Sequence, residues 1–231
     1  KNIWIRNMKV KLISYSQPTT SKAFDNGWRT LEDVVAYCAR VSNPSNQNNT
    51  ETSIKLLKYL IKHGHWSPFE MVSICLEIET TRDIARQILR HRSFSFQEFS
   101  QRYADPTKDL SFITREARLQ DNKNRQNSIE LDNESDLQYE WISKQEKLLE
   151  TIRDTYKWAI NNDIAKEQAR AVLPEGITMS RMYMNGTLRS WIHYIDLRSG
   201  HGTQKEHMEV ARACADAIKP IYPMILDFVN T

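Results

Sequence analysis

Between residues 69 and 80 the chain places an apolar side chain at every second position: Val72, Ile74, Leu76 and Ile78. A period of two is typical of a β-strand that buries one face. We therefore expect a strand over 69–80. Helical segments precede and follow it along the chain, which indicates a sheet that carries helices.

Other segments show strand or helix periodicity. Further strands are expected over 8–16, over 177–184 and near Phe112. Helices are expected over 30–41, 53–63, 81–91, 133–161, 164–173, 187–197 and 203–218. Strands and helices do not alternate regularly, so the predicted fold class is α+β, one domain with a mixed or antiparallel sheet flanked by helices. The longest helical segment, 133–161, is expected to bury a stripe made of Leu137, Trp141, Leu148, Ile152, Tyr156 and Ile160.

The length of 231 residues suits one domain over 1–231, in which residues 1–7 are expected to be a leader or an expression remnant. No run is apolar and long enough to predict a membrane span or a signal peptide. Three cysteines, Cys38, Cys75 and Cys214, are widely spaced. We interpret them as buried thiols in a reducing compartment, so the expected location is cytoplasmic.

The segment 82–103 contains five arginines, no lysine and only two acidic residues. A solvated helix face usually mixes lysine with arginine and pairs both with acids. Arginine presents a planar fork that binds phosphate or carboxylate through two hydrogen bonds. The segment therefore predicts an anion-binding surface. Judged by charge alone, a solvated helix covered by surface salt bridges is an equally good interpretation.

Phosphate-binding loops, metal motifs and nucleophile motifs do not occur in the sequence. Gly200 and Gly202 form the only G-x-G, Lys205 stands where a third glycine would be needed, and there is no Walker lysine motif. Neither a CxxC pair nor an HExxH helix occurs, so no metal is expected. Ser100 has no assignable His–Asp relay and is more typical of a hydrogen-bonding group. An anionic ligand must therefore be held by side chains.

A second set of cations lies near the C-terminus. Arg189 and His193 are four residues apart on one expected helix, and Arg198 ends it. The alternative to ligand binding is that Arg189 and Arg198 form surface ion pairs with Asp196. Gln204 and Glu206 are expected to be solvated polar groups in the first turn of the next helix. Arg170 stands in an apolar stretch. The alternative to an anion-binding role is that its aliphatic stem packs on apolar neighbours while its guanidinium reaches solvent.

The motif Arg90-His91-Arg92, followed after seven residues by Ser100, resembles the signature of flavin-dependent thymidylate synthases. Three further motifs resemble those of the same family and occur in the same order. They are 65–70 (HWSPFE), Arg170 before Leu173-Pro174, and Leu188-Arg189-Ser190 followed by Leu197-Arg198. The resemblance extends over roughly residues 8–225, nearly the whole chain.

The resemblance implies a homotetramer with active sites shared between subunits. It implies transfer of a methylene group from methylenetetrahydrofolate to dUMP, with FAD as cofactor, NADPH as reductant and no protein nucleophile. The residues that would hold FAD are Ser67, Glu70, Arg90, His91, Arg92, Glu98, Arg189 and His193. Those that would hold dUMP are Gln87, Glu98, Ser100, Gln101, Arg102, Arg170 and Arg198.

Within that set, the resemblance implies that Arg102 and Arg170 bind the phosphate of dUMP and that Arg198 binds the uracil. Arg198 and Ser100 are the residues with implied catalytic roles. The sequence departs from the family pattern at three positions, because Gln97, Thr187 and His193 stand where members carry asparagine.

Two alternatives come from other classes of protein. Arginines interleaved with Phe94, Phe96 and Tyr103 are also typical of a module that clamps nucleic-acid phosphates and stacks bases. A helical interaction scaffold would bind no small molecule. The four ordered motifs favour the enzyme, so neither a nucleic-acid partner nor a membrane partner is expected.

Overall fold

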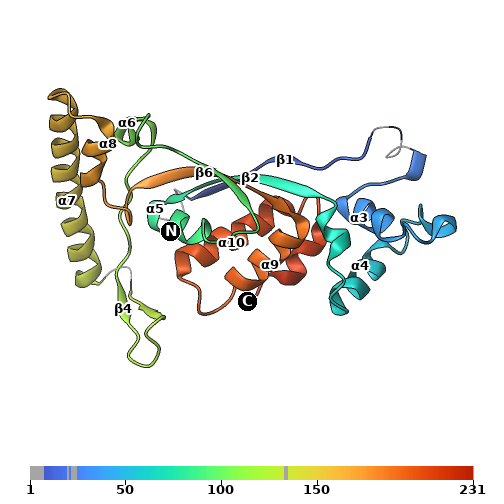
Figure 1. The fold of residues 1–231 in the computed structure, drawn as a ribbon. Helices are drawn as coiled ribbons and strands as arrows, with labels where there is room; N and C mark the ends of the chain where they lie inside the picture. Colours follow the sequence, from blue (N-terminus) through green and yellow to red (C-terminus); the bar gives the residue numbers. More distant parts are fainter. Residues whose placement is uncertain (1–7, 20, 22–24, 133–134, 231) are drawn as a thin grey trace.

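The fold is organised around a four-stranded sheet, drawn in Figure 1. In this computed structural model the described residues are 8–19, 21, 25–132 and 135–230, so the expected leader in residues 1–7 lies outside them. The strands stand in the order β1, β2, β6, β3. Their bounds are β1 Lys9–Tyr15, β2 Ser73–Thr81, β3 Ser95–Glu98 and β6 Met179–Thr187. Each neighbouring pair is antiparallel, which confirms the predicted α+β class.

Strand β2 has the predicted alternation. Ile74, Leu76 and Ile78 are fully buried on one face. The opposite face carries ion pairs, such as Arg181 Nη2 with Glu79 Oε1 at 2.6 Å. The strand begins at Ser73 rather than at residue 69, because Ser67–Glu70 forms a 3₁₀ turn, η2, with a proline in its first turn.

Helices α9 (Leu188–Arg198) and α10 (Lys205–Ile218) cover the apolar face of the sheet and lie below it in Figure 1. Trp191 of α9 is fully buried, and its indole N–H donates to the Ile74 carbonyl at 3.0 Å. The core therefore forms between these two helices and the strands, and it fixes α9 firmly against the sheet.

Two further groups of helices flank this core. At one end lie α3 (Leu31–Ala39), α4 (Ser53–Lys62) and the 3₁₀ turn η1 (Pro44–Asn46). Asp33 links α3 to α4, because its carboxylate accepts hydrogen bonds from the Arg29 N–H at 2.9 Å and the Ser53 hydroxyl at 2.9 Å. Helix α5 (Arg82–Ile88) directly follows β2, and η4 (Pro223–Phe228) packs on α10 near the C-terminus.

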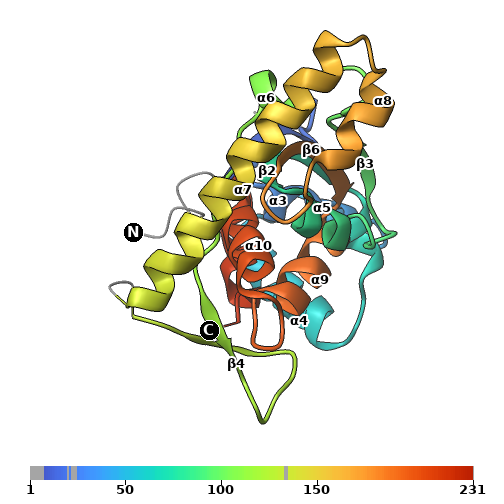
Figure 2. The same cartoon turned by 90° about the vertical axis from the view of Figure 1, so that its left-hand side faces the viewer.

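The other end is built around α7 (Asp136–Asn161), which Figure 2 shows running diagonally across the side of the molecule that faces the viewer. Beside it are α6 Pro106–Asp109, β4 Arg118–Gln120, β5 Ser128–Glu130, α8 Lys166–Ala169 and the 3₁₀ turn η3 Arg170–Val172. The expected helix 164–173 is thus split into α8 and η3. The strand expected near Phe112 is a single bridge to Thr178.

The buried face of α7 differs from the predicted stripe. Leu137, Trp141 and Leu148 are exposed, whereas the face turned inward is Gln138, Gln145, Leu149, Ile152, Tyr156 and Ala159. The two glutamines accept from the N–H groups of Ala117 and Arg115 at 2.7 Å and 2.8 Å. Helix α7 covers an extended backbone segment there, and buried backbone donors require partners.

Among the described residues, no helix is both long and apolar enough to cross a membrane.

Candidate active site

The loop after α5 brings two predicted site residues into contact. Arg198 Nε donates to His91 Nε2 at 3.1 Å. Burial and the charge of Arg198 lower the pKa of His91 to about 4, so the ring is neutral at physiological pH and its Nε2 lone pair can accept. The pairing orients the guanidinium at the end of α9.

The expected alternative for Arg198, a pairing with Asp196, is not observed. The Asp196 carboxylate instead accepts a hydrogen bond from the Asn230 amide at 3.3 Å. Within the described part of the chain, Arg198 has no carboxylate partner. Its charge is therefore not neutralised by a carboxylate of those residues.

The loop itself is held against α9 and the sheet. The Ser190 hydroxyl donates to the Ser93 carbonyl at 3.3 Å, and the Phe94 ring lies 4.8 Å from the Trp191 ring. Phe94 packs directly over Gly186 of β6, where a Cβ would overlap the ring. These contacts fix the segment that carries the Arg90-His91-Arg92 motif.

Arg90 and Arg92 flank His91 and are both exposed. In the described parts of the chain neither side chain forms an ion pair or hydrogen bond, so both guanidinium groups are available to an anion. The other arginines of the segment behave differently. Arg82 is buried and lies 3.4 Å from Glu98, and Arg86 lies 3.3 Å from Glu175. The run of arginines is therefore divided and does not form one continuous basic surface, which disfavours the nucleic-acid alternative.

A second group of predicted residues gathers between η2 and α9. Arg189 Nη1 lies 3.0 Å from Glu70 Oε1, and the Trp66 and His193 rings are 4.4 Å apart. A pocket of about 520 Å³ opens here, and its lining includes Ser67 and Arg189. Burial and the charge of Arg189 lower the pKa of His193. The pairing of Arg189 with Asp196 that the sequence allowed is thus replaced by a pairing with Glu70.

A third group lies where the chain leaves β3. Arg102 Nη2 is 3.4 Å from Glu167 Oε2, and the Lys166 ammonium donates to the Tyr103 carbonyl at 3.0 Å. Arg170 is exposed nearby in η3, while Ser100 is half-buried. The Gln101 side chain is buried, and its amide nitrogen has no hydrogen-bond partner.

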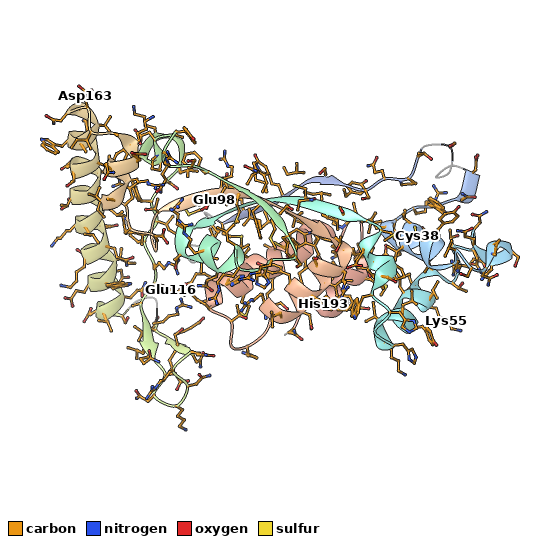
Figure 3. The ribbon with its side chains drawn as sticks, in the orientation of Figure 1. Cys38, Lys55, Glu98, Glu116, Asp163 and His193 are labelled. Atoms are coloured by element: carbon orange, nitrogen blue, oxygen red, sulfur yellow. The ribbon has the colours of Figure 1, made fainter. Side chains whose placement is uncertain are left out.

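Glu98 belongs to this third group and accepts from the Ser180 hydroxyl at 2.9 Å. Figure 3 shows Glu98 on the side of the molecule toward α7, whereas His193 lies on α9 toward α3 and α4. Within the described residues no hydrogen bond or ion pair joins the third group to the second. One chain thus brings the predicted site residues together in three separate groups.

Four polar residues that the sequence did not mark as a unit connect α5 to α9 and α10. Gln87 bonds to Gln204 and His207, and His207 bonds to Tyr194. The expectation that Gln204 and Glu206 are solvated was wrong. Glu206 is 3% exposed and pairs with Arg115 and Arg118. The i, i+3 spacing of Gln204 and His207 was the only sequence signal for this arrangement.

The cysteines also differ from expectation. Cys214 is buried, but Cys38 and Cys75 are only half-buried. Burial raises the pKa values of Cys75 and Cys214, which is the opposite of what an activated thiolate requires. Within the described residues, no three His, Cys, Asp or Glu side chains gather closely enough to hold a metal ion.

The fold and the three groups define an α+β protein whose arginine side chains are suited to anionic ligands. Comparison with known proteins gives the family. Residues 27–224 match the family described as thymidylate synthase complementing protein. The chain is 48% identical to a probable flavin-dependent thymidylate synthase of Paramecium bursaria Chlorella virus 1, covering 96% of this chain and 100% of that protein. It is 46% identical to the flavin-dependent thymidylate synthase of Synechocystis, covering 94% and 97%.

The chain therefore belongs to the flavin-dependent thymidylate synthase family. Its fold is also that of the UMP/dUMP methylase PolB from Streptomyces cacaoi, solved with 5-Br dUMP. The TM-score is 0.78 at 23% sequence identity, covering 96% of this chain and 93% of the other.

Proposed function

We propose that this protein is a flavin-dependent thymidylate synthase, which converts dUMP to dTMP. The observation that carries the proposal is the cluster formed by Arg198, neutral His91 and the unpaired Arg90 and Arg92. It offers charged forks to an anionic nucleotide without a glycine loop. The names of the relatives and the nucleotide bound to PolB agree with this ligand class.

The donor set fits a flavin dinucleotide, FAD. A diphosphate needs several cationic or N–H donors, and Arg90 and Arg92 supply two unneutralised forks. Ser67, Arg189 and His193 would add contacts beside the pocket under η2, where Glu70 fixes the guanidinium of Arg189. His91 and Glu98 complete the proposed FAD contacts. When bound, the flavin supplies the hydride chemistry, and the protein supplies orientation and charge.

The remaining predicted residues suit dUMP. Arg102 and Arg170, both exposed, would bind its phosphate, and the buried amide nitrogen of Gln101 is a donor that lacks a partner. Ser100 and Glu98 would lie beside the nucleotide. Gln87 and Arg198 would bind the uracil, where the guanidinium stabilises negative charge that develops on a uracil carbonyl. Methylenetetrahydrofolate would supply the carbon and NADPH the reducing equivalents.

A shared site explains why one chain holds its predicted residues in three groups. We propose that a homotetramer brings the Arg102 group of one subunit to the Arg198 group of another. Exposed apolar side chains on α7, among them Trp141 and Leu148, favour assembly through protein contacts. One domain over residues 1–231 and a cytoplasmic location both stay predictions.

Bound flavin is the first test of the proposal. The purified protein is expected to be yellow and to release FAD on denaturation, measured by its visible spectrum and by chromatography of the released cofactor. The double variant Arg90→Ala, Arg92→Ala should lose most of the FAD, because two charge-assisted contacts to the diphosphate are removed. Lys55→Ala is the matched control, because Lys55 is an exposed cation on α4 far from α5 (Figure 3). A colourless wild-type protein that also fails to take up added FAD contradicts the proposal.

A further inference from the structure

A continuous chain of hydrogen bonds runs from the N-terminus of α10 into the core. Gln204 Nε2 lies 2.9 Å from a carboxylate oxygen of Glu206, and Gln87 Nε2 lies 2.8 Å from Gln204 Oε1. Gln87 Oε1 lies 3.3 Å from His207 Nδ1, and His207 Nε2 lies 3.1 Å from the Tyr194 hydroxyl. Gln87 therefore stands in the middle of this relay and is the member assigned to dUMP.

The direction of the relay is set at Glu206. Burial raises the pKa of this carboxyl, but the hydrogen bond from Arg118 and the charge of Arg115 outweigh burial, so the pKa lies below its usual value. The carboxylate is ionised and can only accept hydrogen bonds. Gln204 must therefore turn its amide N–H toward Glu206 and its carbonyl oxygen toward Gln87.

The same logic fixes Gln87 and His207. Because Gln204 presents an oxygen, Gln87 must donate to it and turn its own oxygen toward His207. His207 must then donate from Nδ1. Burial, together with the charge of Arg198, lowers the pKa of His207 to about 3, so the ring is neutral and Nε2 accepts from Tyr194. Burial raises the pKa of Tyr194, which keeps its hydroxyl protonated and able to donate.

The relay fixes the orientation of the Gln87 amide but occupies only part of its hydrogen-bonding capacity. An amide has two N–H donors and two acceptor lone pairs, so the half-buried Gln87 keeps one of each for a ligand. A flipped Gln87 would set oxygen against oxygen at Gln204. It would also force His207 to move its proton from Nδ1 to Nε2 and the Tyr194 hydroxyl to turn from donor to acceptor. Gln204 cannot flip in compensation, because its N–H groups face the carboxylate of Glu206.

The site for such a ligand lies close by. The His91 ring, which accepts from Arg198, lies 6.2 Å from the His207 ring and 4.9 Å from the Tyr194 ring. Gln87 and Arg198 therefore belong to one cluster. Uracil offers an N3–H donor between two carbonyl acceptors, whereas cytosine offers an acceptor at N3 and a donor at N4. An amide held in one orientation distinguishes these two edges, and an amide free to flip does not.

We propose that His207, together with Tyr194 and Gln204, is a positioning residue that holds the Gln87 amide in one orientation and so makes the site selective for uracil over cytosine nucleotides. The inference rests on the proposed function, because it takes dUMP as the ligand of Gln87. His207 acts through Gln87 and touches no reacting atom.

Binding of dUMP and dCMP to the flavin-loaded protein tests the inference. Affinities are measured by calorimetry, with flavin content and melting temperature as checks on folding. His207→Leu removes both hydrogen bonds and is expected to narrow the preference for dUMP over dCMP by about tenfold, the effect of one or two lost hydrogen bonds. His207→Asn is the conservative variant, because its amide N–H takes the place of Nδ1–H, and it should retain most of the preference.

A second variant covers the case in which His207→Leu fails to fold. Gln204→Met changes a half-buried side chain and removes the acceptor that holds the N–H of Gln87, so it should narrow the preference in the same way. Nitrogen NMR of labelled histidine should show His207 protonated at Nδ1 in the wild-type protein. An unchanged ratio of dUMP to dCMP affinity in either folded variant overturns the inference alone. A wild-type protein with flavin that binds no dUMP overturns the proposed function as well.

Discussion

Replacing Arg198 with alanine is expected to slow oxidation of the reduced flavin by methylenetetrahydrofolate and dUMP by on the order of a hundred- to a thousandfold at saturating substrate. In the structure this guanidinium donates to neutral His91 and has no carboxylate partner among the described residues. Its charge is therefore available to a uracil carbonyl as that oxygen becomes more negative. An interaction that strengthens in the transition state affects the rate constant itself and not only binding.

Stopped-flow absorbance of the flavin measures this rate directly. Arg198→Lys is the informative comparison, because it keeps the positive charge and loses the planar fork, and it should recover only part of the rate. Lys55→Ala, which changes an exposed cation on α4, is the control for a lost surface charge. Unchanged flavin oxidation in Arg198→Ala at saturating dUMP would reject the catalytic role.

Replacing Arg102 with alanine should weaken dUMP binding by roughly ten- to a hundredfold, because a lost hydrogen bond to a charged partner typically costs about 1.5–3 kcal/mol. In the isolated chain Arg102 pairs with Glu167 at 3.4 Å, and both side chains are about half exposed. Such exposed pairs contribute little, so a phosphate can displace the glutamate.

Deoxyuridine separates the phosphate contact from any other effect of this substitution. It lacks the phosphate, so its weaker binding should change little between the wild-type protein and Arg102→Ala. Glu167→Gln removes the competing carboxylate and leaves Arg102 in place, so its dUMP affinity should be equal to or higher than that of the wild type. Equal losses of dUMP and deoxyuridine binding in Arg102→Ala would exclude the phosphate role.

The central part of the fold was predictable because burial on one face leaves a simple pattern. Strand β2 and helices α9 and α10 bury regular apolar faces, and their predicted positions agree with the structure to within a few residues. Strands β3, β4 and β5 were not predicted. Each has only three or four residues, which is too short for a period of two to stand out.

Helix α7 shows a different limit. Part of its predicted apolar stripe, including Trp141 and Leu148, is exposed. The helix instead buries Gln138 and Gln145, whose side chains bond to the backbone at residues 115 and 117. A hydrophobic pattern ranks side chains by transfer from water and does not register a backbone that needs hydrogen-bond partners.

For the candidate site, the sequence marked residues that carry charge or match a family motif. It marked both His91 and Arg198 but could not show that their side chains are in contact. It missed His207 and Tyr194, because both join the site only through Gln87. Gln87 and Gln204 are 117 residues apart, and this hydrogen-bond network forms only when α5 and α10 pack together. Polar residues in a first helical turn look solvated until their tertiary partners are known.

A single-turnover experiment tests the central claim most directly. The flavin of the wild-type protein is reduced without oxygen and then mixed with dUMP and methylenetetrahydrofolate, while flavin absorbance and dTMP are followed together. Conversion of a transferred methylene to a methyl group needs two electrons, so one dTMP should form for each flavin oxidised, and omission of dUMP should leave the flavin reduced. Formation of dTMP without flavin oxidation, or flavin oxidation that yields no dTMP, would contradict the account.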